Sequence, residues 1–314
     1  MLTFKSILRL AGPPYFFQPL QVFQRLRVEY FWRAKNAKKS VTTALPWGLP
    51  ITIDPHEAIG YVIACHGLYE VSVTEALWCL TEPGDLVVDA GSNIGYTASI
   101  LAIRAGPRGR VLCFEPHPLV FQLLQENVAL WKKDERCATF VLHEAALGAT
   151  DGRAALHTSD WFQTNHGTAW ISAPTKFTEN VSVLEVALRS LDSLIDDQKT
   201  VGIVKMDVQG SELSVLEGMA KLFARRAVRD IVFEELAPYP APTHNLLQSQ
   251  GYAIFGLEER LGGLRCIPKA QARATSDVSD IPNYLATLQP DRAIARLNHR
   301  IWRSFGPGRF LPQL

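Results

Sequence analysis

From about residue 84 onward, short apolar runs alternate with longer stretches of helical periodicity. This alternation predicts strands joined by helices, as in an α/β fold with a parallel sheet. The predicted strands are "DLVVDAG", "GRVLCFEP", "ATFVLHEAA", "VGIVKMDV", "RDIVFEEL", "YAIFGL" and a last one, "NYLATL", expected to close an edge of the sheet. The predicted helices cover residues 94–104, 119–130, 211–222 and 245–250.

The flanking regions are patterned less regularly. Residues 41–83 predict a short strand pair around "LPITIDP" and a helix over residues 73–80, and residues 148–185 form a looser stretch. No internal repeat or clear linker divides the chain. We therefore expect one domain over residues 46–290, preceded by a basic, aromatic segment (1–45) and followed by a basic amphipathic helix (291–314).

The charge distribution is uneven although the formal net charge of the 314 residues is only +1. Residues 1–40 carry eight basic side chains against Glu29 alone, whereas the remainder of the chain is acidic. Near the C-terminus, arginines recur at helical spacing at Arg292, Arg296, Arg300 and Arg303. Such ends are compatible with peripheral contact with an anionic membrane, but the favoured interpretation is a helix packed on the domain with its arginines in solvent.

The five cysteines are scattered, with no C-x-x-C pair and no histidine at metal-site spacing. This pattern predicts neither a disulfide framework nor a structural zinc and fits a reducing cytoplasm. The N-terminus lacks an uninterrupted apolar run of membrane-spanning length and does not read as a signal peptide. We expect a cytoplasmic protein.

The stretch "VVDAGSNIGY" runs from a strand into a glycine turn that opens a helix, which is where open parallel sheets bind nucleotide-like ligands. A dinucleotide turn needs G-x-G-x-x-G, whereas here Gly91 and Gly95 enclose three other residues. Asp89 would oppose a pyrophosphate and suits a cationic ligand, such as the sulfonium of S-adenosylmethionine. Glu115 ends the next strand, where its two oxygens can accept both hydroxyls of a ribose.

Four segments together resemble the FkbM family of S-adenosylmethionine-dependent methyltransferases: "PGDLVVDAGSNIGYTASILA", "VLCFEPHP", "LDSLI" and "VKMDVQGSELSVLEGM". The resemblance covers roughly residues 60–290. It implies a class I methyltransferase fold, a Rossmann-like three-layer sandwich with a mostly parallel seven-stranded sheet and an antiparallel last strand. The family usually has an acidic residue where Gln209 stands.

The resemblance also implies a set of cofactor-binding residues. The turn and the end of the next strand supply Asp89, Gly91, Ser92, Asn93, Gly95, Glu115 and Pro116. The segment "GLYE" resembles the part of the family that lies over the cofactor, with Tyr69 over the methionine end and Glu70 accepting from its ammonium group. A core position for Tyr69 and a surface position for Glu70 are the alternative.

Candidate catalytic residues end the later strands. Asp207 is expected to act as the base, to orient the acceptor, or to serve a structural role; by strand alternation Lys205 points to the same side. His166, on a loop, is an alternative base, and a solvated loop histidine without a catalytic role is the favoured interpretation. Of Glu234 and Glu235, one is expected to face the cleft, and Glu235 is taken as the catalytic candidate.

These observations predict methyl transfer from S-adenosylmethionine to a hydroxyl group of a sugar, glycan or other small-molecule natural product. Asp207 with Glu235 is compatible with a divalent cation, but the spacing requires none and no metal ligands are assigned. The alternatives are an NAD-dependent oxidoreductase and a noncatalytic nucleoside-binding protein. Nucleic acid is not expected as a partner, because the charge is near neutral and the N/D-P-P-Y/F block of base methylation is absent. The sequence leaves the oligomeric state open.

Overall fold

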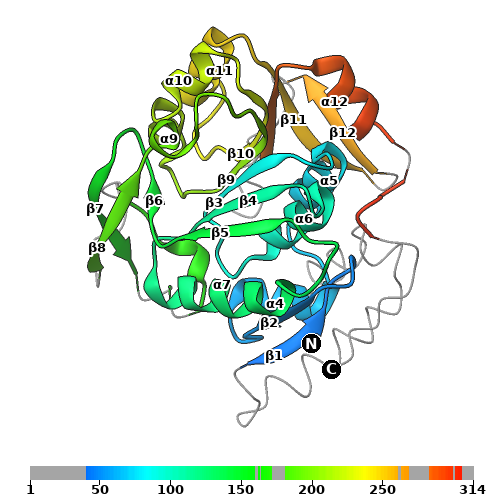
Figure 1. The fold of residues 1–314 in the computed structure, drawn as a ribbon, viewed down its shortest axis with the longest axis vertical. Coiled ribbons are helices and arrows are strands. Elements are labelled where there is room, and N and C mark those ends of the chain that lie inside the picture. Colours follow the sequence, from blue (N-terminus) through cyan, green and yellow to red (C-terminus); the bar gives the residue numbers. More distant parts are fainter. Residues whose placement is uncertain are drawn as a thin grey trace.

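The computed structural model describes residues 40–159, 162, 164–171, 181–260, 263–268, 283–299 and 301–305. An eight-stranded sheet with helices on both faces forms its centre (Figure 1). The strand order is β12-β11-β13-β10-β9-β3-β4-β5. The bounds, in that order, are Gly263–Pro268, Ala253–Arg260, Asn283–Thr287, Val228–Glu234, Val201–Met206, Leu86–Ala90, Arg110–Phe114 and Thr139–His143.

The five strands from β5 to β10 are parallel, and β13 lies antiparallel between β10 and β11. The three-layer α/β class and the antiparallel last strand are therefore confirmed. Two details differ from expectation. Strand β13 is internal rather than at the edge, as its buried residues 284–287 require, and an eighth strand, β12, pairs antiparallel with β11.

Two hydrophobic cores lie on opposite faces of the sheet. The first contains residues from α4 (Ala58–His66), α5 (Val71–Leu80), α6 (Tyr96–Ala105), α7 (Pro118–Trp131) and α12 (Pro290–Leu297). The second contains residues from α8 (Leu191–Leu194), α9 (Glu212–Glu217), α10 (Ala220–Ala224) and α11 (Pro242–Ser249). The helices predicted within the sheet region are thus present, except that one predicted helix is split into α9 and α10.

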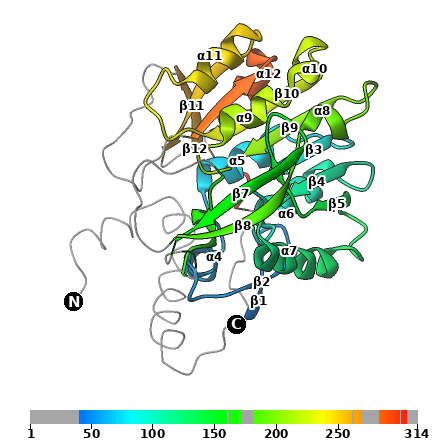
Figure 2. The same ribbon diagram turned by 90° about the vertical axis from the view of Figure 1, so that its left-hand side faces the viewer.

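Two smaller β units flank the main sheet. The hairpin of β1 (Val41–Ala44) and β2 (Pro50–Ile53) confirms the strand pair predicted there. The loosely patterned stretch folds as a separate three-stranded sheet, which the sequence did not reveal. It comprises β6 (Ala146–Leu147), β7 (Gly152–Thr158) and β8 (Ser182–Arg189), and Figure 2 shows the long β7–β8 hairpin in front of the main sheet.

The expected helix over residues 291–314 is wrong in its extent, because α12 ends at Leu297 and residues 301–305 are not helical. Trp302 and Phe305 are buried and stacked, with ring centroids 5.4 Å apart. The carboxylate of Glu75 accepts the backbone N–H groups of residues 303 and 304, each at 2.8 Å. This segment is therefore packed into the domain.

The arginines of α12 are paired with the domain rather than left in solvent. Arg292 lies 2.9 Å from Asp230 and 2.8 Å from Glu82, and Arg296 lies 2.7 Å from Glu82. Arg300, residues 306–314 and residues 1–39 lie outside the described residues. Among the helices that are described, none has the length and apolar character needed to cross a bilayer.

Candidate functional site

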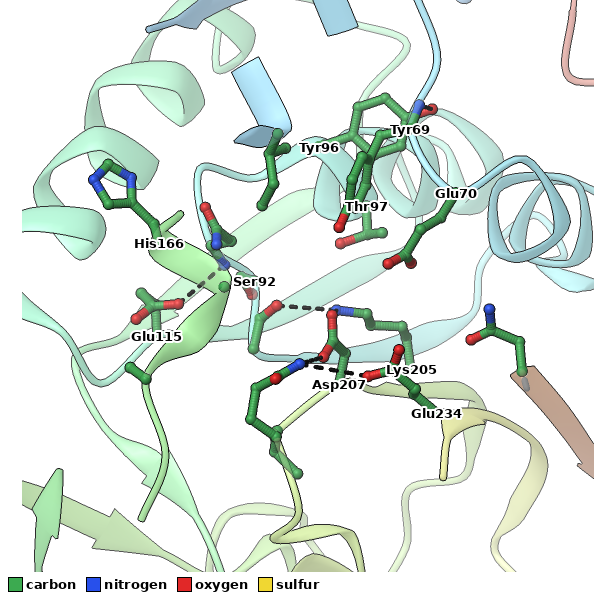
Figure 3. A pocket seen from close by; sticks show the side chains of 18 of the residues that line it. Tyr69, Glu70, Ser92, Tyr96, Thr97, Glu115, His166, Lys205, Asp207 and Glu234 are labelled. Atoms are coloured by element: carbon green, nitrogen blue, oxygen red, sulfur yellow. Dashed lines mark hydrogen bonds and ion pairs between the residues drawn. The ribbon is translucent and has the colours of Figure 1, made fainter. Parts of the chain in front are cut away.

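A cavity of about 1410 Å³ opens at the carboxyl ends of β3, β4, β9 and β10 (Figure 3). This is the edge at which open α/β sheets bind ligands. Residues from the start of α5, from β11 and from the turn η3 (His166–Thr168) complete its walls. The cavity therefore joins segments that lie far apart in the sequence.

The two glycines of the first turn are required for different reasons. Gly91 has φ +74°, and a Cβ atom there would lie 2.0 Å from the carbonyl oxygen of Asp207. Gly95 has φ +94°, and its Cβ atom would lie 2.8 Å from Leu124 and 3.0 Å from Trp131, both on α7. Gly91 lines the cavity, whereas Gly95 is not among the described lining residues and allows α6 and α7 to pack closely.

The backbone N–H groups of this turn are all used inside the protein. Those of residues 91 and 92 donate to the carbonyl of Phe114 at 3.0 and 2.9 Å. Those of residues 93, 94 and 95 donate to Glu115, to the Asn93 side chain and to the Ser92 carbonyl. A pyrophosphate would need such groups free, so the turn does not fit a dinucleotide.

Glu115 lines the cavity where the sequence predicts a ribose ligand. Its two oxygens accept the backbone N–H groups of Asn93 (3.1 Å) and His117 (2.9 Å), which fixes the carboxylate while leaving a lone pair on each oxygen. Burial raises the pKa of Glu115 to about 7, although these two hydrogen bonds oppose the shift. Pro116 lines the cavity beside it.

Ser92 also lines the cavity, but its hydroxyl joins β3 to β4. It donates to the carbonyl of Asp89 at 2.8 Å and accepts the backbone N–H of Phe114 at 3.1 Å. The Asp89 side chain is fully buried and accepts a hydrogen bond from Thr97 at 2.8 Å. Asp89 is not among the described residues that line the cavity, so its predicted direct contact with the cofactor is not the arrangement that the structure shows.

A cluster of charged side chains occupies the other end of the cavity (Figure 3). We call it the Lys205 cluster. Lys205, Asp207, Glu70 and Glu234 line the cavity, and the buried Asp89 lies behind them against Lys205. Sheet register explains its centre, because residues 89 and 205 are paired across β3 and β9. The Lys205 ammonium group lies 3.7 Å from the Asp89 carboxylate and 3.6 Å from that of Asp207, and it donates to the carbonyl of residue 91 at 3.0 Å.

Burial favours the neutral form of Lys205, but the surrounding carboxylates outweigh burial and raise its pKa. The lysine is therefore a permanent cation at neutral pH and not a proton acceptor. As predicted, Asp207 lies on the same side as Lys205 and lines the cavity.

Glu234, and not the predicted Glu235, lies on the cavity wall. The carboxylate of Glu235 points away from the cavity and accepts from the backbone N–H of Ala237 and from the hydroxyl of Thr243. Successive side chains of a strand point to opposite faces, so only one of the two glutamates can face the cavity. Burial, with Asp207 and Glu70 nearby, raises the pKa of Glu234 to about 8.

Gln209 joins two carboxylates of the cluster, which the sequence did not indicate. Its side-chain amide donates to Asp207 at 2.8 Å and to Glu234 at 3.4 Å. The residue has φ +52°, an uncommon conformation for a residue with a side chain. An amide at this position supplies a hydrogen-bond donor where a carboxylate would add repulsion.

Tyr69 and Glu70 line the cavity at the start of α5. The backbone N–H of Tyr69 donates to the phenol of Tyr96 at 3.0 Å, and the two rings meet edge to face. Burial, with the negative charge of Glu70 nearby, raises the pKa of the Tyr69 phenol well above its ordinary value. Burial, with a contribution from Asp207, raises the pKa of Glu70 to about 7. Their contact with the methionine end of a cofactor stays a prediction.

His166 lines the cavity at its other end. The backbone N–H of His166 donates to Glu57 at 3.1 Å, and its ring lies 5.2 Å from that of Phe162. Figure 3 shows the imidazole on the Glu115 side of the glycine turn, across from Asp207. The geometry thus brings together Asp207, Lys205 and Glu234, but it does not bring His166 to them.

No group of three or more histidine, cysteine, aspartate or glutamate side chains is arranged to hold a metal ion in the part of the chain that the structure describes. Lys205 occupies the space among the carboxylates where a cation would lie. A divalent cation is therefore not supported at this site.

The strand order and the position of the cavity define a class I methyltransferase. Comparison with known families gives the particular group, since the family model described as "Methyltransferase FkbM domain" matches residues 89–254, more than half of the chain. The chain belongs to the FkbM family of S-adenosylmethionine-dependent methyltransferases and is an enzyme. The resemblance noted in the sequence is confirmed.

Individual relatives are distant. "Methyltransferase 1" of Beauveria bassiana is 27% identical over 54% of this chain and 72% of its own length. "Hexuronic acid methyltransferase AglP" of Haloferax volcanii is 30% identical over 49% of this chain and 56% of its own length. A solved structure of methyltransferase FkbM from Methylobacillus flagellatus KT aligns with 17% identity and a TM-score of 0.42, covering 74% of this chain and 56% of that chain.

Proposed function

We propose that this enzyme transfers the methyl group of S-adenosylmethionine to a hydroxyl oxygen of a sugar, glycan or related small molecule. One observation carries the proposal. The glycine turn has no free amide for a phosphate, whereas carboxylates from the start of α5 and from the ends of β4, β9 and β10 face the same cavity. Such a pocket fits a nucleoside that is cationic and carries no phosphate, and it disfavours the NAD-dependent alternative.

The residues that would hold the cofactor lie at both ends of the cavity. Glu115 would accept the ribose hydroxyls, because its oxygens are fixed by the main chain. Glu70, supported by Tyr69, would accept from the ammonium group. When bound, S-adenosylmethionine supplies a methyl group on a positively charged sulfur. The surplus of carboxylates over Lys205 favours binding of such a cation.

A hydroxyl acceptor must lose its proton as its oxygen bonds to the methyl carbon. Asp207 and Glu234 face the cavity together and are the proposed proton acceptors, with Gln209 orienting both. A raised pKa of about 8 makes Glu234 a stronger base than an ordinary carboxylate. General-base catalysis contributes about 10²–10⁴-fold, less than the roughly 7–11 kcal/mol available from orientation of the reactants. The main task of the cavity walls is therefore to hold the acceptor oxygen in line with the methyl carbon and the sulfur.

The acceptor class rests on the family and on one relative. The Haloferax volcanii protein is named for methylation of a hexuronic acid, and a sugar hydroxyl is the corresponding proposal here. Nucleic acid is not proposed as an acceptor. Contact with a membrane surface, a cytoplasmic location and the domain limits at residues 46 and 290 stay predictions, since the basic residues 1–39 lie outside the described part.

The test is a methyl-transfer assay in which radiolabelled S-adenosylmethionine is incubated with a panel of sugars and glycans. Asp207→Asn should retain cofactor affinity, measured by calorimetry, and lose about 10²–10⁴-fold in turnover. The matched control is Asp197→Asn, at an exposed position before the start of β9, whereas Asp207 follows its end; this variant should behave as wild type. Unchanged turnover of Asp207→Asn would remove this residue from the chemistry.

A further inference from the structure

The cavity lining is strongly acidic beyond what the cofactor needs. Its described charged residues, His166 aside, comprise six carboxylates and two basic groups: Glu70, Glu115, Asp207, Glu234, Glu258, Glu259, Lys205 and Arg260. S-adenosylmethionine brings a net charge of only about +1. The raised pKa values of Glu70, Glu115 and Glu234 leave these three partly protonated at neutral pH, but the described lining still holds more acidic than basic groups once the cofactor is bound.

Neither basic group in the described lining is free to pair with an anion on the acceptor. Lys205 is buried and already contacts Asp89, Asp207 and the carbonyl of residue 91. Arg260 lies at the more exposed end of β11, where its guanidinium is 2.6 Å from the carboxylate of Glu258.

The rest of the acceptor side presents groups suited to an uncharged polyol. Asn283 of β13 is paired with Glu234 of β10 and lines the same wall. Amide and carboxylate groups both form hydrogen bonds with hydroxyl groups. Trp170 and Ile267 also line the cavity and offer apolar surface for the C–H faces of a sugar ring.

Resting on the proposed function, we propose that the acceptor is an uncharged polyol and that a carboxylate, sulfate or phosphate close to the reacting hydroxyl is rejected. Such an anion would lie beside Glu70, Asp207 and Glu234 without a free partner cation among the residues that the structure describes. Like charges placed together reduce affinity for the wrong ligand, which is how charge produces specificity.

The experiment uses the full chain with labelled S-adenosylmethionine and three matched pairs of acceptors: the methyl glycosides of glucose, galactose and mannose, and their uronate counterparts. The expected kcat/KM for the neutral member is higher by at least about tenfold in every pair that reacts. Equal or faster methylation of a uronate overturns the inference and leaves the proposed function intact. If S-adenosylmethionine binds but no member of either set is methylated, both are overturned.

A variant sharpens the test without touching the Lys205 cluster. Glu258→Gln releases the guanidinium of Arg260 from its ion pair, so uronates should gain at least about threefold in kcat/KM while neutral glycosides change by less than about twofold. Glu126→Gln, at an exposed position on α7, is the matched control and should leave both classes unchanged. No gain for uronates in Glu258→Gln would contradict the electrostatic basis of the selectivity.

Discussion

The carboxylate of Glu115 is held by the main chain, whereas the carboxylates of the Lys205 cluster are held by other side chains. Two backbone N–H groups fix the oxygens of Glu115. In the cluster, one ammonium group and the amide of Gln209 connect several carboxylates. A main-chain site is fixed once the strands pair, but a side-chain network depends on every member, so substitutions should have wider effects in the cluster.

The largest effect is expected for Lys205→Met, which removes the cation beside the fully buried Asp89. Loss of one partner of a buried ion pair typically costs about 3–5 kcal/mol, and we expect the free energy of unfolding to fall by about 3 kcal/mol. Urea unfolding, monitored by circular dichroism, measures this free energy of unfolding. Lys199→Met, at an exposed position, is the control. Adding Asp89→Asn should recover most of the loss; without such recovery, the pair is not the source of the stability.

The next effect concerns the other end of the cavity. Glu115→Gln keeps the shape but loses the charge, and hydrogen bonds to charged groups contribute about 1.5–3 kcal/mol. The Kd for S-adenosylmethionine should rise about 10–150-fold, with little change in kcat at saturating cofactor. Calorimetry measures the Kd, and steady-state kinetics measure kcat. Glu144→Gln, at an exposed position, is the control. A loss of kcat at unchanged Kd would place Glu115 in the chemistry instead.

A smaller effect should appear in the pH dependence of stability. The pKa of Glu115 and of Glu70 is raised to about 7, and that of Glu234 to about 8. The folded protein therefore binds more protons than the unfolded chain between about pH 4.5 and pH 8, so stability should fall as the pH rises through this window. Calorimetric unfolding without cofactor should show a lower Tm at pH 8 than at pH 5.5.

The same experiment distinguishes the two ends of the cavity. Glu115→Gln should reduce the fall of Tm with pH up to about pH 7. Glu234→Gln should reduce this fall up to about pH 8. A Tm that does not fall between pH 5.5 and pH 8 would mean that these carboxylates are already ionised in the folded protein at pH 5.5.

The smallest effect is expected for Gln209→Met, which preserves the length of the side chain but removes the donor between Asp207 and Glu234. One hydrogen bond is worth about 1 kcal/mol, so kcat should fall roughly fivefold near pH 7. The pH–rate profile should also move to higher pH, because the two carboxylates then repel each other without a bridging donor. Gln198→Met, at an exposed position, should change neither quantity. An unchanged pH–rate profile for Gln209→Met would show that the hydrogen bonds from Gln209 do not control how the two carboxylates take up the proton of the acceptor.

Elements and residues with a strong local pattern are those that the sequence predicted correctly. Strand periodicity predicted seven of the eight strands of the main sheet, and strand alternation placed Lys205 and Asp207 on one side. Elements that depend on strand pairing or on packing against distant segments were not predicted. Strand β12 and the β7–β8 hairpin have weak patterns, and α12 ends at Leu297, beyond which Trp302 and Phe305 pack into the domain. The choice between Glu234 and Glu235 depends on which face of β10 meets the cavity.

The sequence alone determined the α/β class, the glycine turn and the family, because these depend on periodicity and on residues close together in the chain. Only the tertiary structure decided which carboxylates share the cavity, that Asp89 lies behind the wall and that Gln209 bridges two acids. Those features depend on strand register and on the approach of distant segments, and no single stretch of sequence encodes either.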